Sequence, residues 1–266
     1  MILFDSHCHL NDPAYAKDMV ATVKRAAEAG VISVMVVGID EATSGQAVAI
    51  ARANKTYAAS VGVHPHDAKS CSEKTLAALV DLAKDPTVRA WGETGLDFNR
   101  MFSPKEIQEK WFVRQLEMAD ELNLPLIFHE RDSECRFIEI LSDRYKTAGR
   151  AGVVHCFSGT RHDLDACLNL GLHIGITGII TIASRGKNLR DMVKKIPADR
   201  LLVETDAPYL TPAPERNQHR RNEPAFVRSV LLKLAEVRGE DPKTLAEQIW
   251  RNTCRLFRMD IKETAS

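Results

Sequence analysis

The segment VISVMVVGI (31–39) is apolar at nearly every position, with Val and Ile predominating. A strand with one face in water alternates apolar and polar residues, whereas a strand covered on both faces reads as a continuous apolar run. This segment therefore predicts a buried strand of a parallel sheet. A helical pattern over 15–29, stopped by Gly30, precedes it, and another over 41–53 follows it. The order helix, strand, helix is typical of an α/β protein.

The same alternation of short apolar segments and helix-like segments continues along the chain. The predicted strands cover 1–7, 31–39, 57–64, 88–93, 125–129, 151–157, 172–178 and 200–206. The other predicted helices cover 72–84, 104–122, 132–145, 163–170 and 187–195, with a final helical region over 223–258. Eight β/α repeats predict a single (β/α)₈ TIM barrel, one domain over residues 1–266, in preference to an open doubly wound sheet.

Composition narrows the classes of protein. Lys plus Arg and Asp plus Glu number 36 each, so the net charge of zero disfavours a broad basic surface for nucleic acid. No apolar run approaches the roughly 20 residues needed to cross a bilayer, and no secretory signal is evident. The six cysteines form no CxxC pair, a pattern typical of reduced thiols. We expect a cytoplasmic protein with no membrane association and no obligatory protein partner.

Side chains able to bind metal ions follow the predicted strands, at the end where active sites of such barrels lie. Six are candidate ligands: His7, His9, Glu93, His129, His155 and Asp206. Read singly, each histidine is more readily interpreted as a hydrogen-bonded residue at a strand end than as a ligand. Their recurrence at strand ends favours ligands, and a buried carboxylate such as Glu93 needs a counter-charge.

The donor types indicate how many ions to expect. His7 and His9 are two apart on a strand, so their side chains point the same way. Imidazole with carboxylate suits Zn²⁺, Mn²⁺, Co²⁺ or Fe²⁺, and Mg²⁺ prefers more oxygen ligands. Six ligands exceed the usual three or four of one catalytic zinc. We therefore expect two cations bridged by Glu93, one completed by His7, His9 and Asp206 and the other by His129 and His155.

Eight short motifs in order resemble those of the TatD-type metal-dependent deoxyribonucleases, within the amidohydrolase-like superfamily. They are FDSHCHL (4–10), GVHPH (62–66), GETGLDF (92–98), HERD (129–132), HCFSG (155–159), GITG (175–178), ETDAPYL (204–210) and RRNEPA (220–225). The resemblance implies a TIM barrel that binds two divalent cations (Zn, Mn or Mg) and hydrolyses phosphodiester bonds in DNA. An exonuclease acting in the 3′-5′ direction is among the activities implied. Glu130 departs from the pattern, since a smaller residue is common there.

Roles for individual residues follow from this reading. Asp206 is the expected base that takes a proton from the attacking water. His64 is expected to contact the scissile phosphate or protonate the leaving oxygen. Glu204 either orients a ligand histidine or forms a buried ion pair. His66 either lines the cleft or is a loop residue bonded to backbone.

Arginines supply the expected contacts to substrate. Arg220 and Arg221 follow the last predicted strand and suit phosphate recognition through their planar guanidinium groups. The alternative is a solvated charge run that pairs with Glu215 or Glu223. Arg131 and Arg161, each just past a predicted ligand strand, are further candidates. A neutral chain with a local basic cluster fits single strands or strand ends of DNA, with low sequence selectivity because few aromatic residues can be assigned to the site.

Two other functions remain open at this point. The same centre suits hydrolysis of amides or esters, and a metal-binding scaffold without catalysis is the third reading. Structural metal sites are usually closed by protein ligands, whereas six ligands shared by two ions leave open positions, which favours catalysis. The sequence leaves open DNA, RNA or a small phosphodiester as substrate, endonuclease or exonuclease action, the native metal and the oligomeric state.

Overall fold

The computed structural model describes residues 1–144, 151–213 and 215–260. Its strands form one parallel sheet in sequence order, which confirms the predicted TIM barrel. The strands are β1 (Leu3–Cys8), β2 (Val31–Val37), β3 (Ala58–Val61), β4 (Val88–Asp97), β5 (Leu126–Arg131), β6 (Gly152–Val154), β7 (His173–Ile176) and β8 (Leu201–Val203). The backbone after β8 returns to β1, where His9 N–H donates to the Ala207 carbonyl at 2.8 Å and Asp206 N–H to the His7 carbonyl at 3.0 Å.

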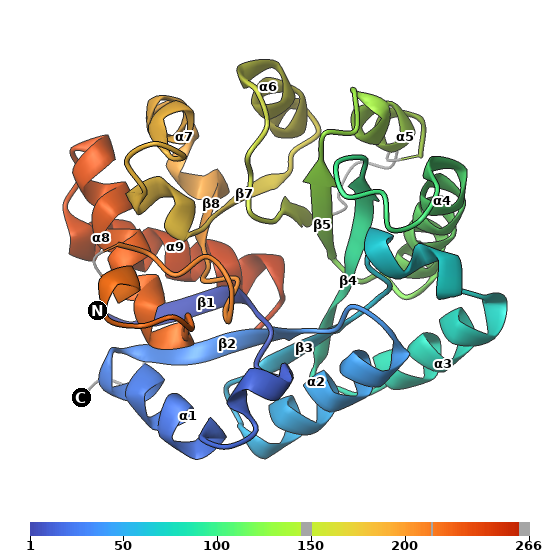
Figure 1. Cartoon of the computed structure of the whole chain (residues 1–266), viewed down its shortest axis with the longest axis horizontal. Coiled ribbons are helices and arrows are strands. Elements are labelled where there is room, and N and C mark those ends of the chain that lie inside the picture. Colours follow the sequence, from blue (N-terminus) through green and yellow to red (C-terminus); the bar gives the residue numbers. More distant parts are fainter. Residues whose placement is uncertain (145–150, 214, 261–266) are drawn as a thin grey trace.

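Helices surround the strands as an outer ring (Figure 1). They are α1 (Met19–Glu28), α2 (Glu41–Ala53), α3 (Glu73–Ala83), α4 (Lys105–Glu121), α5 (Arg136–Arg144), α6 (Arg161–Asn169), α7 (Lys187–Val193), α8 (Val227–Arg238) and α9 (Pro242–Leu256). Each lies within a predicted helical segment or overlaps it. None of the helices in the described ranges combines the length and apolar character required to cross a membrane.

Backbone conformation explains where helix boundaries differ from the prediction. The helix predicted over 132–145 begins only at Arg136, because Asp132, Glu134 and Cys135 have positive φ angles of 53°, 53° and 70°. Residue 145, its predicted end, lies outside the described residues. The final helical region is divided at Gly239, whose left-handed φ of 68° ends α8.

Strand β4 is longer than predicted and continues to Asp97, so Glu93 lies within the strand and not at its end. Two glycines let this strand approach its neighbour β5. A Cβ at Gly95 would lie 1.9 Å from the His129 carbonyl oxygen, and one at Gly92 would lie 2.5 Å from that of Ile127. The glycines thus bring the β4 and β5 backbones close at the level of Glu93 and His129.

The barrel interior is apolar at its amino-terminal end. Inward-facing side chains pack with aromatic residues at the end of α9, where the Phe4 ring lies 6.0 Å from Trp250 and 6.2 Å from Phe257 between centroids. A second, larger apolar layer fills the space between strands and helices. Apolar residues at and after the end of α9 thus pack against this end of the barrel, and the polar side chains of the strands gather at the carboxyl end.

Candidate metal centre

Histidine and carboxylate side chains from six strands or strand ends meet at the carboxyl end of the barrel. They lie in a cavity of about 790 Å³ that includes His9, Glu93, His129, His155 and Asp206 in its lining. His7 lies beneath it and is fully buried. The structure therefore brings together all six residues that the sequence predicts as ligands, although they are far apart along the chain.

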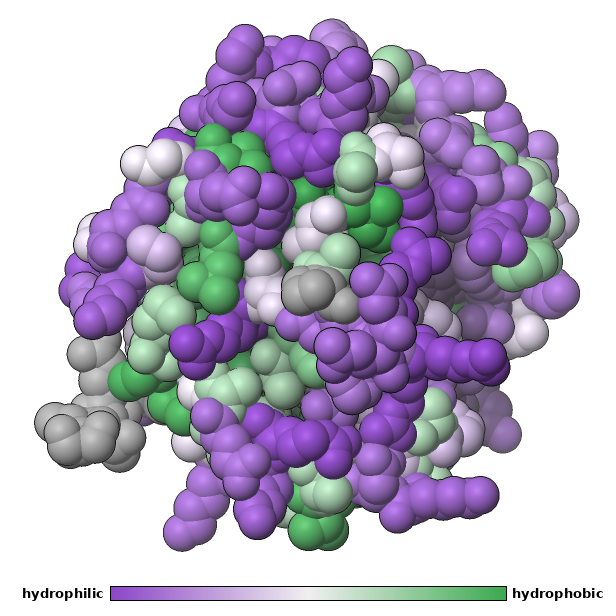
Figure 2. Space-filling view, turned by 60° about the vertical axis from the view of Figure 1, so that its left-hand side comes forward, coloured by the Kyte–Doolittle hydropathy of each residue, from purple (hydrophilic) through white to green (hydrophobic). Residues whose placement is uncertain are grey.

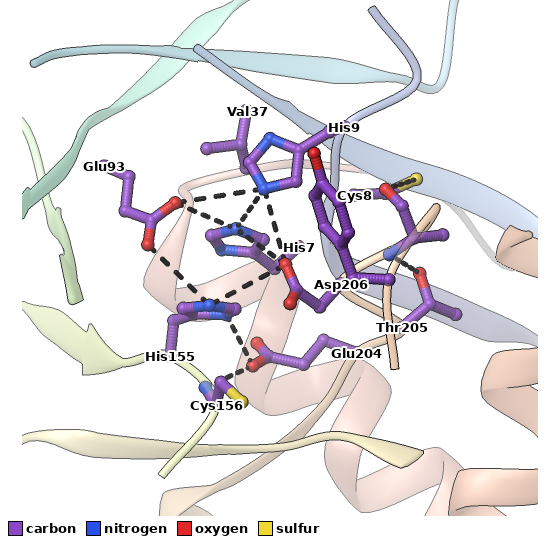
Figure 3. Close-up of polar contacts among 12 residues, drawn as sticks. His7, Cys8, His9, Val37, Glu93, His155, Cys156, Glu204, Thr205 and Asp206 are labelled. Atoms are coloured by element: carbon purple, nitrogen blue, oxygen red, sulfur yellow. Dashed lines mark hydrogen bonds and ion pairs between the residues drawn. The ribbon is translucent and has the colours of Figure 1, made fainter. Parts of the chain in front are cut away.

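Three side chains and one oxygen of Glu93 form the first donor set (Figure 3). His7 Nε2 lies 3.3 Å from His9 Nε2 and 3.3 Å from Glu93 Oε2. Asp206 Oδ1 lies 3.4 Å from His9 Nε2 and 3.8 Å from His7 Nε2. The two histidines thus face the same point, as their spacing on the strand predicts.

The other oxygen of Glu93 faces a second donor set. Oε1 lies 3.0 Å from His129 Nδ1 and 3.7 Å from His155 Nε2. Each oxygen of this one carboxylate is therefore directed to a different group of imidazoles. Such an arrangement suits a carboxylate that bridges two ions.

The distances between donor atoms fit the space that a small cation requires. Metal–nitrogen and metal–oxygen bonds near 2.0–2.2 Å hold the ligands of a tetrahedral ion about 3.3–3.5 Å apart. In the first donor set, the closest pairs are separated by 3.3, 3.3 and 3.4 Å. Imidazole and carboxylate are also the ligands that divalent transition metals prefer. Groups of these same side chains are close enough together to hold metal ions.

The charges of the site also favour a cation. Burial would raise the pKa of Glu93, but the imidazoles of His64, His155 and His7 outweigh it and hold that pKa well below its usual range. Burial lowers the pKa of His155, yet the nearby carboxylates raise it to about 10. The buried carboxylates therefore attract positive charge into the cavity, which protons on imidazoles supply when no ion is bound.

A carboxylate lies behind each histidine of the second donor set. His155 Nδ1 is 2.9 Å from Glu204 Oε1, and His129 Nε2 is 3.2 Å from Asp97 Oδ2. Such partners fix the orientation of a ligand histidine and increase its basicity. For Glu204, this contact is compatible with both predicted roles, orienting a ligand histidine and forming a buried ion pair. The role of Asp97 was not predicted, although its even spacing from Glu93 along β4 puts both side chains on one face.

Asp206 owes its position to a buried network that joins β1 to the backbone after β8. Asp5 accepts hydrogen bonds from Thr205 N at 2.8 Å and Thr205 Oγ1 at 2.5 Å. Asn222 Nδ2 donates to the carbonyl oxygens of Thr205, at 2.9 Å, and Tyr209, at 2.6 Å. These bonds hold the segment on both sides of Asp206, so the sequence motif around Asn222 contributes to the shape of the site.

His64 contacts the second donor set, but its hydrogen bonds indicate a proton donor and not a metal ligand. Its Nδ1 accepts a hydrogen bond from His66 N–H at 3.0 Å, so in the neutral ring the proton resides on Nε2. That Nε2 lies 3.1 Å from His129 Nδ1 and 3.4 Å from Glu93 Oε1. Burial and the neighbouring His129 lower the pKa of His64 to about 4, which keeps the ring neutral. His64 therefore presents an N–H group to the cavity.

His66 and two exposed aromatic residues line the mouth of the cavity. His66 Nε2 lies 2.8 Å from Asp97 Oδ2, so this histidine belongs to the same network as His129. Phe102 and Tyr209 are 53% and 55% exposed, although both line the cavity. The sequence does not identify these rings, because nothing in their local pattern shows that two different loops place them at one opening.

The predicted arginines have separate environments. Arg221 donates to both carboxylate oxygens of Asp18, each at 2.7 Å, and to the Ala14 carbonyl, and its guanidinium lies over the Tyr15 ring. The prediction considered pairing with Glu215 or Glu223 as its alternative. Arg221 does form an ion pair with Glu223 at 3.9 Å, although Asp18 is the nearer partner. Arg220 instead lines a smaller cavity beside the central one.

The two further arginine candidates also differ. Arg131 lines the central cavity, whereas Arg161 donates to Asp165 at 2.9 Å on the surface of α6. Glu130, which departs from the family pattern, accepts hydrogen bonds from Ser133 N and Oγ at 3.1 and 2.8 Å. It faces a different cavity, between α5 and α6.

A closed β/α barrel with these donors at its carboxyl end has the architecture of the metal-dependent hydrolases. Comparison with known proteins supports the same class of protein. A family model described as TatD related DNase matches residues 4–258. The protein named 3'-5' ssDNA/RNA exonuclease TatD from Erwinia billingiae is 45% identical over 260 residues, which are 97% of this chain and 99% of that relative. The protein of the same name from Escherichia fergusonii is 43% identical over 257 residues, covering 96% of this chain and 98% of that relative.

Solved structures show the same relationship. The crystal structure of a TatD homolog from Escherichia coli K12 has a TM-score of 0.87 and 31% sequence identity, and covers 96% of this chain and 98% of that one. This chain belongs to the TatD-related DNase family, and the family resemblance expected from the sequence motifs is confirmed.

Proposed function

We propose that this chain is a nuclease that hydrolyses phosphodiester bonds of single-stranded DNA or RNA from the 3′ end, with two divalent cations in the central cavity. One observation carries the proposal: the two oxygens of Glu93 face separate donor sets. The relatives named as 3'-5' exonucleases of single-stranded DNA and RNA support the substrate and the direction. Family membership also favours a phosphodiester over the amide or ester alternatives.

In this proposal His7, His9, Asp206 and Glu93 hold one cation, and Glu93, His129 and His155 hold the other. Zn²⁺ or Mn²⁺ suits this mixture of imidazole and carboxylate better than Mg²⁺. Cations held by these residues would supply charge to neutralise the non-bridging phosphate oxygens and would lower the pKa of a coordinated water. The protein's task is to position that water and phosphate and to manage the protons.

Asp206 and His64 are the residues that we assign to proton transfer. The Asp206 side chain is 14% exposed, so it can reach water that enters the cavity. Burial raises the pKa of Asp206, but the facing His155 and His9 imidazoles outweigh this effect and leave the pKa below its usual value. A carboxylate that stays ionised at neutral pH is able to accept a proton from water. His64 presents its Nε2–H to the cavity, where it can donate a hydrogen bond to a phosphate oxygen or the leaving oxygen.

The mouth of the cavity suits a nucleotide. Phe102 and Tyr209 offer exposed ring faces on which a base can stack, an interaction that tolerates any base. His66 and Arg131 also line this opening and provide polar contacts. We further propose a cytoplasmic location, which accords with the free thiols of Cys8, Cys71 and Cys167.

Metal-loaded protein incubated with end-labelled DNA and RNA tests the proposal. We expect single strands to be shortened from the 3′ end, and Asp206→Asn to abolish cleavage while a surface control, Asp165→Asn, retains it. Label placed at the 5′ end distinguishes stepwise shortening from internal cuts. Cleavage that persists unchanged in Asp206→Asn would reject Asp206 as the base. A protein that cleaves no nucleic acid but hydrolyses esters or amides would reject the proposed function.

A further inference from the structure

A smaller cavity of about 460 Å³ opens beside the central one, and we call it the side pocket. Its polar lining is basic: Arg185 contributes from the loop before α7, and Arg216, His219 and Arg220 from the segment after β8. Arg185, Tyr209 and Leu210 line both cavities. The two cavities are therefore neighbours, separated by side chains that belong to both.

The arginines of the side pocket differ from most others in the molecule. Arg221 and Arg161 each form an ion pair with an aspartate. Within the described ranges, by contrast, no acidic residue lines the side pocket, and no ion pair is found for Arg185, Arg216 or Arg220. All three are exposed. Positive charge thus accumulates locally in a chain whose net charge is zero.

The acidic residue next to Arg216 in the sequence does not face the side pocket. Glu215 precedes Arg216, but its carboxylate accepts a hydrogen bond from Ser229 Oγ on α8. The backbone of this segment is fixed, because His219 N–H donates to the Glu215 carbonyl at 2.8 Å and Arg216 N–H to that of Pro212 at 2.9 Å. On the face drawn in Figure 2, hydrophilic residues predominate, with groups of apolar residues among them. The local chemistry is therefore that of an anion site and not of an apolar docking surface.

We propose that the side pocket binds a backbone phosphate of the retained strand, next to the phosphodiester that is cut in the central cavity. This inference rests on the proposed nuclease function. Guanidinium groups recognise phosphate through paired N–H donors, and unpaired arginines have those donors available. The exposure of the pocket leaves room for the strand to continue into solvent. Tyr209, which lines both cavities, can stack on the base of the nucleoside whose sugar links the two phosphates.

A double variant, Arg216→Gln with Arg220→Gln, tests the side pocket. Arg185 stays unchanged in this variant because it also lines the central cavity. The matched control is Arg228→Gln with Arg255→Gln, which removes the same charge at two exposed positions that line neither cavity. Two substrates are compared: a short single-stranded oligonucleotide and bis(p-nitrophenyl) phosphate, whose single diester cannot reach the side pocket.

We expect KM for the oligonucleotide to rise about tenfold to a hundredfold in the double variant, as for loss of hydrogen bonds to a charged group. Hydrolysis of bis(p-nitrophenyl) phosphate should not change. The salt dependence of oligonucleotide binding should also weaken, by about 0.7 in the log–log slope for each phosphate that the variant no longer binds. An equal loss on both substrates, an unchanged KM for the oligonucleotide, or the same effect in the control would overturn the proposal.

Binding measurements separate this proposal from the proposed function. If the wild-type protein hydrolyses bis(p-nitrophenyl) phosphate but no oligonucleotide, the proposed function fails. The side pocket is then judged by fluorescence anisotropy of a labelled oligonucleotide: weaker binding by the double variant than by the control supports an anion site, and equal binding rejects it.

Discussion

The two donor sets share Glu93 but differ in the partners of their histidines, that is, in what the ring nitrogen facing away from the set contacts. In the second set, Glu204 contacts the outer nitrogen of His155 and Asp97 that of His129. In the first set, His7 Nδ1 is buried and has no hydrogen-bond partner among the described residues. Outer carboxylates orient ligand histidines and make them more basic. The difference suggests that the second set is the better organised before any ion binds, while the first set depends more on Asp206.

Glu93 is where the two sets meet, so its loss should have the largest effect. In Glu93→Gln, a neutral amide replaces the carboxylate that faces both sets, and both cations should bind poorly. We expect nuclease activity to fall by about a thousandfold or more, since two-ion stabilisation of the transition state contributes several kcal/mol. Metal content after gel filtration, with activity on single-stranded DNA, measures this. A variant that retains both ions would show that Glu93 is not their bridge.

Glu204→Gln and Asp97→Asn should affect the second set more than the first. Each keeps the size of the side chain but removes the negative charge behind a histidine, and we expect metal affinity or activity to fall about tenfold to a hundredfold. Metal titration of each variant gives the measurement. Asp85→Asn is the matched control, because this carboxylate accepts hydrogen bonds from Thr87 and Arg52 and from no side chain of either donor set. If the control loses as much as the other two, the loss reflects general destabilisation.

Single-ligand variants should reveal which set fills first. We expect His129→Ala to abolish the tighter of two manganese binding steps and His9→Ala to abolish the weaker. The steps should differ by about tenfold in affinity, the lower end of the effect of outer partners. Calorimetric titration of both variants checks this order. The reverse assignment would mean that the direct contact of Asp206 outweighs the orienting carboxylates.

The smallest expected effect concerns His173, a histidine that belongs to neither donor set. Burial, with a further contribution from Arg200, lowers the pKa of His173 to about 4. The unfolded chain then binds more protons than the folded one between about pH 4 and 6.5, so stability should fall as pH decreases through that window. We expect a loss of about 1 kcal/mol between about pH 7 and 5.5. Urea unfolding of wild type and His173→Gln at both pH values measures it, and the same pH dependence in the variant would contradict this origin.

The sequence predicted the features that depend on local patterns. Alternating apolar and helical segments located all eight strands, and the polar residues at their ends identified the members of both donor sets. Asp97 escaped prediction because the strand containing Glu93 was expected to stop at that residue, whereas it continues to Asp97. Gly92 and Gly95, which have positive φ angles, allow β4 to continue close beside β5.

Loop geometry limited the prediction of substrate contacts. Arg220 and Arg221 are neighbours in sequence, yet one lines the side pocket and the other pairs with Asp18. Which way successive side chains point in an irregular segment depends on distant partners that the local pattern does not reveal. The same holds for Phe102 and Tyr209, which come from different loops and reach one cavity.

The contacts between Asp5 and Thr205 join residues 200 positions apart. A ribosome releases the strand bearing His7 and His9 long before it releases Asp206, so the growing polypeptide holds two of the first donors without the third. Only when the last strand docks beside the first does the cavity gain Asp206, the residue that we propose as the base. Metal binding by the first donor set should therefore depend on docking of the last strand against the first.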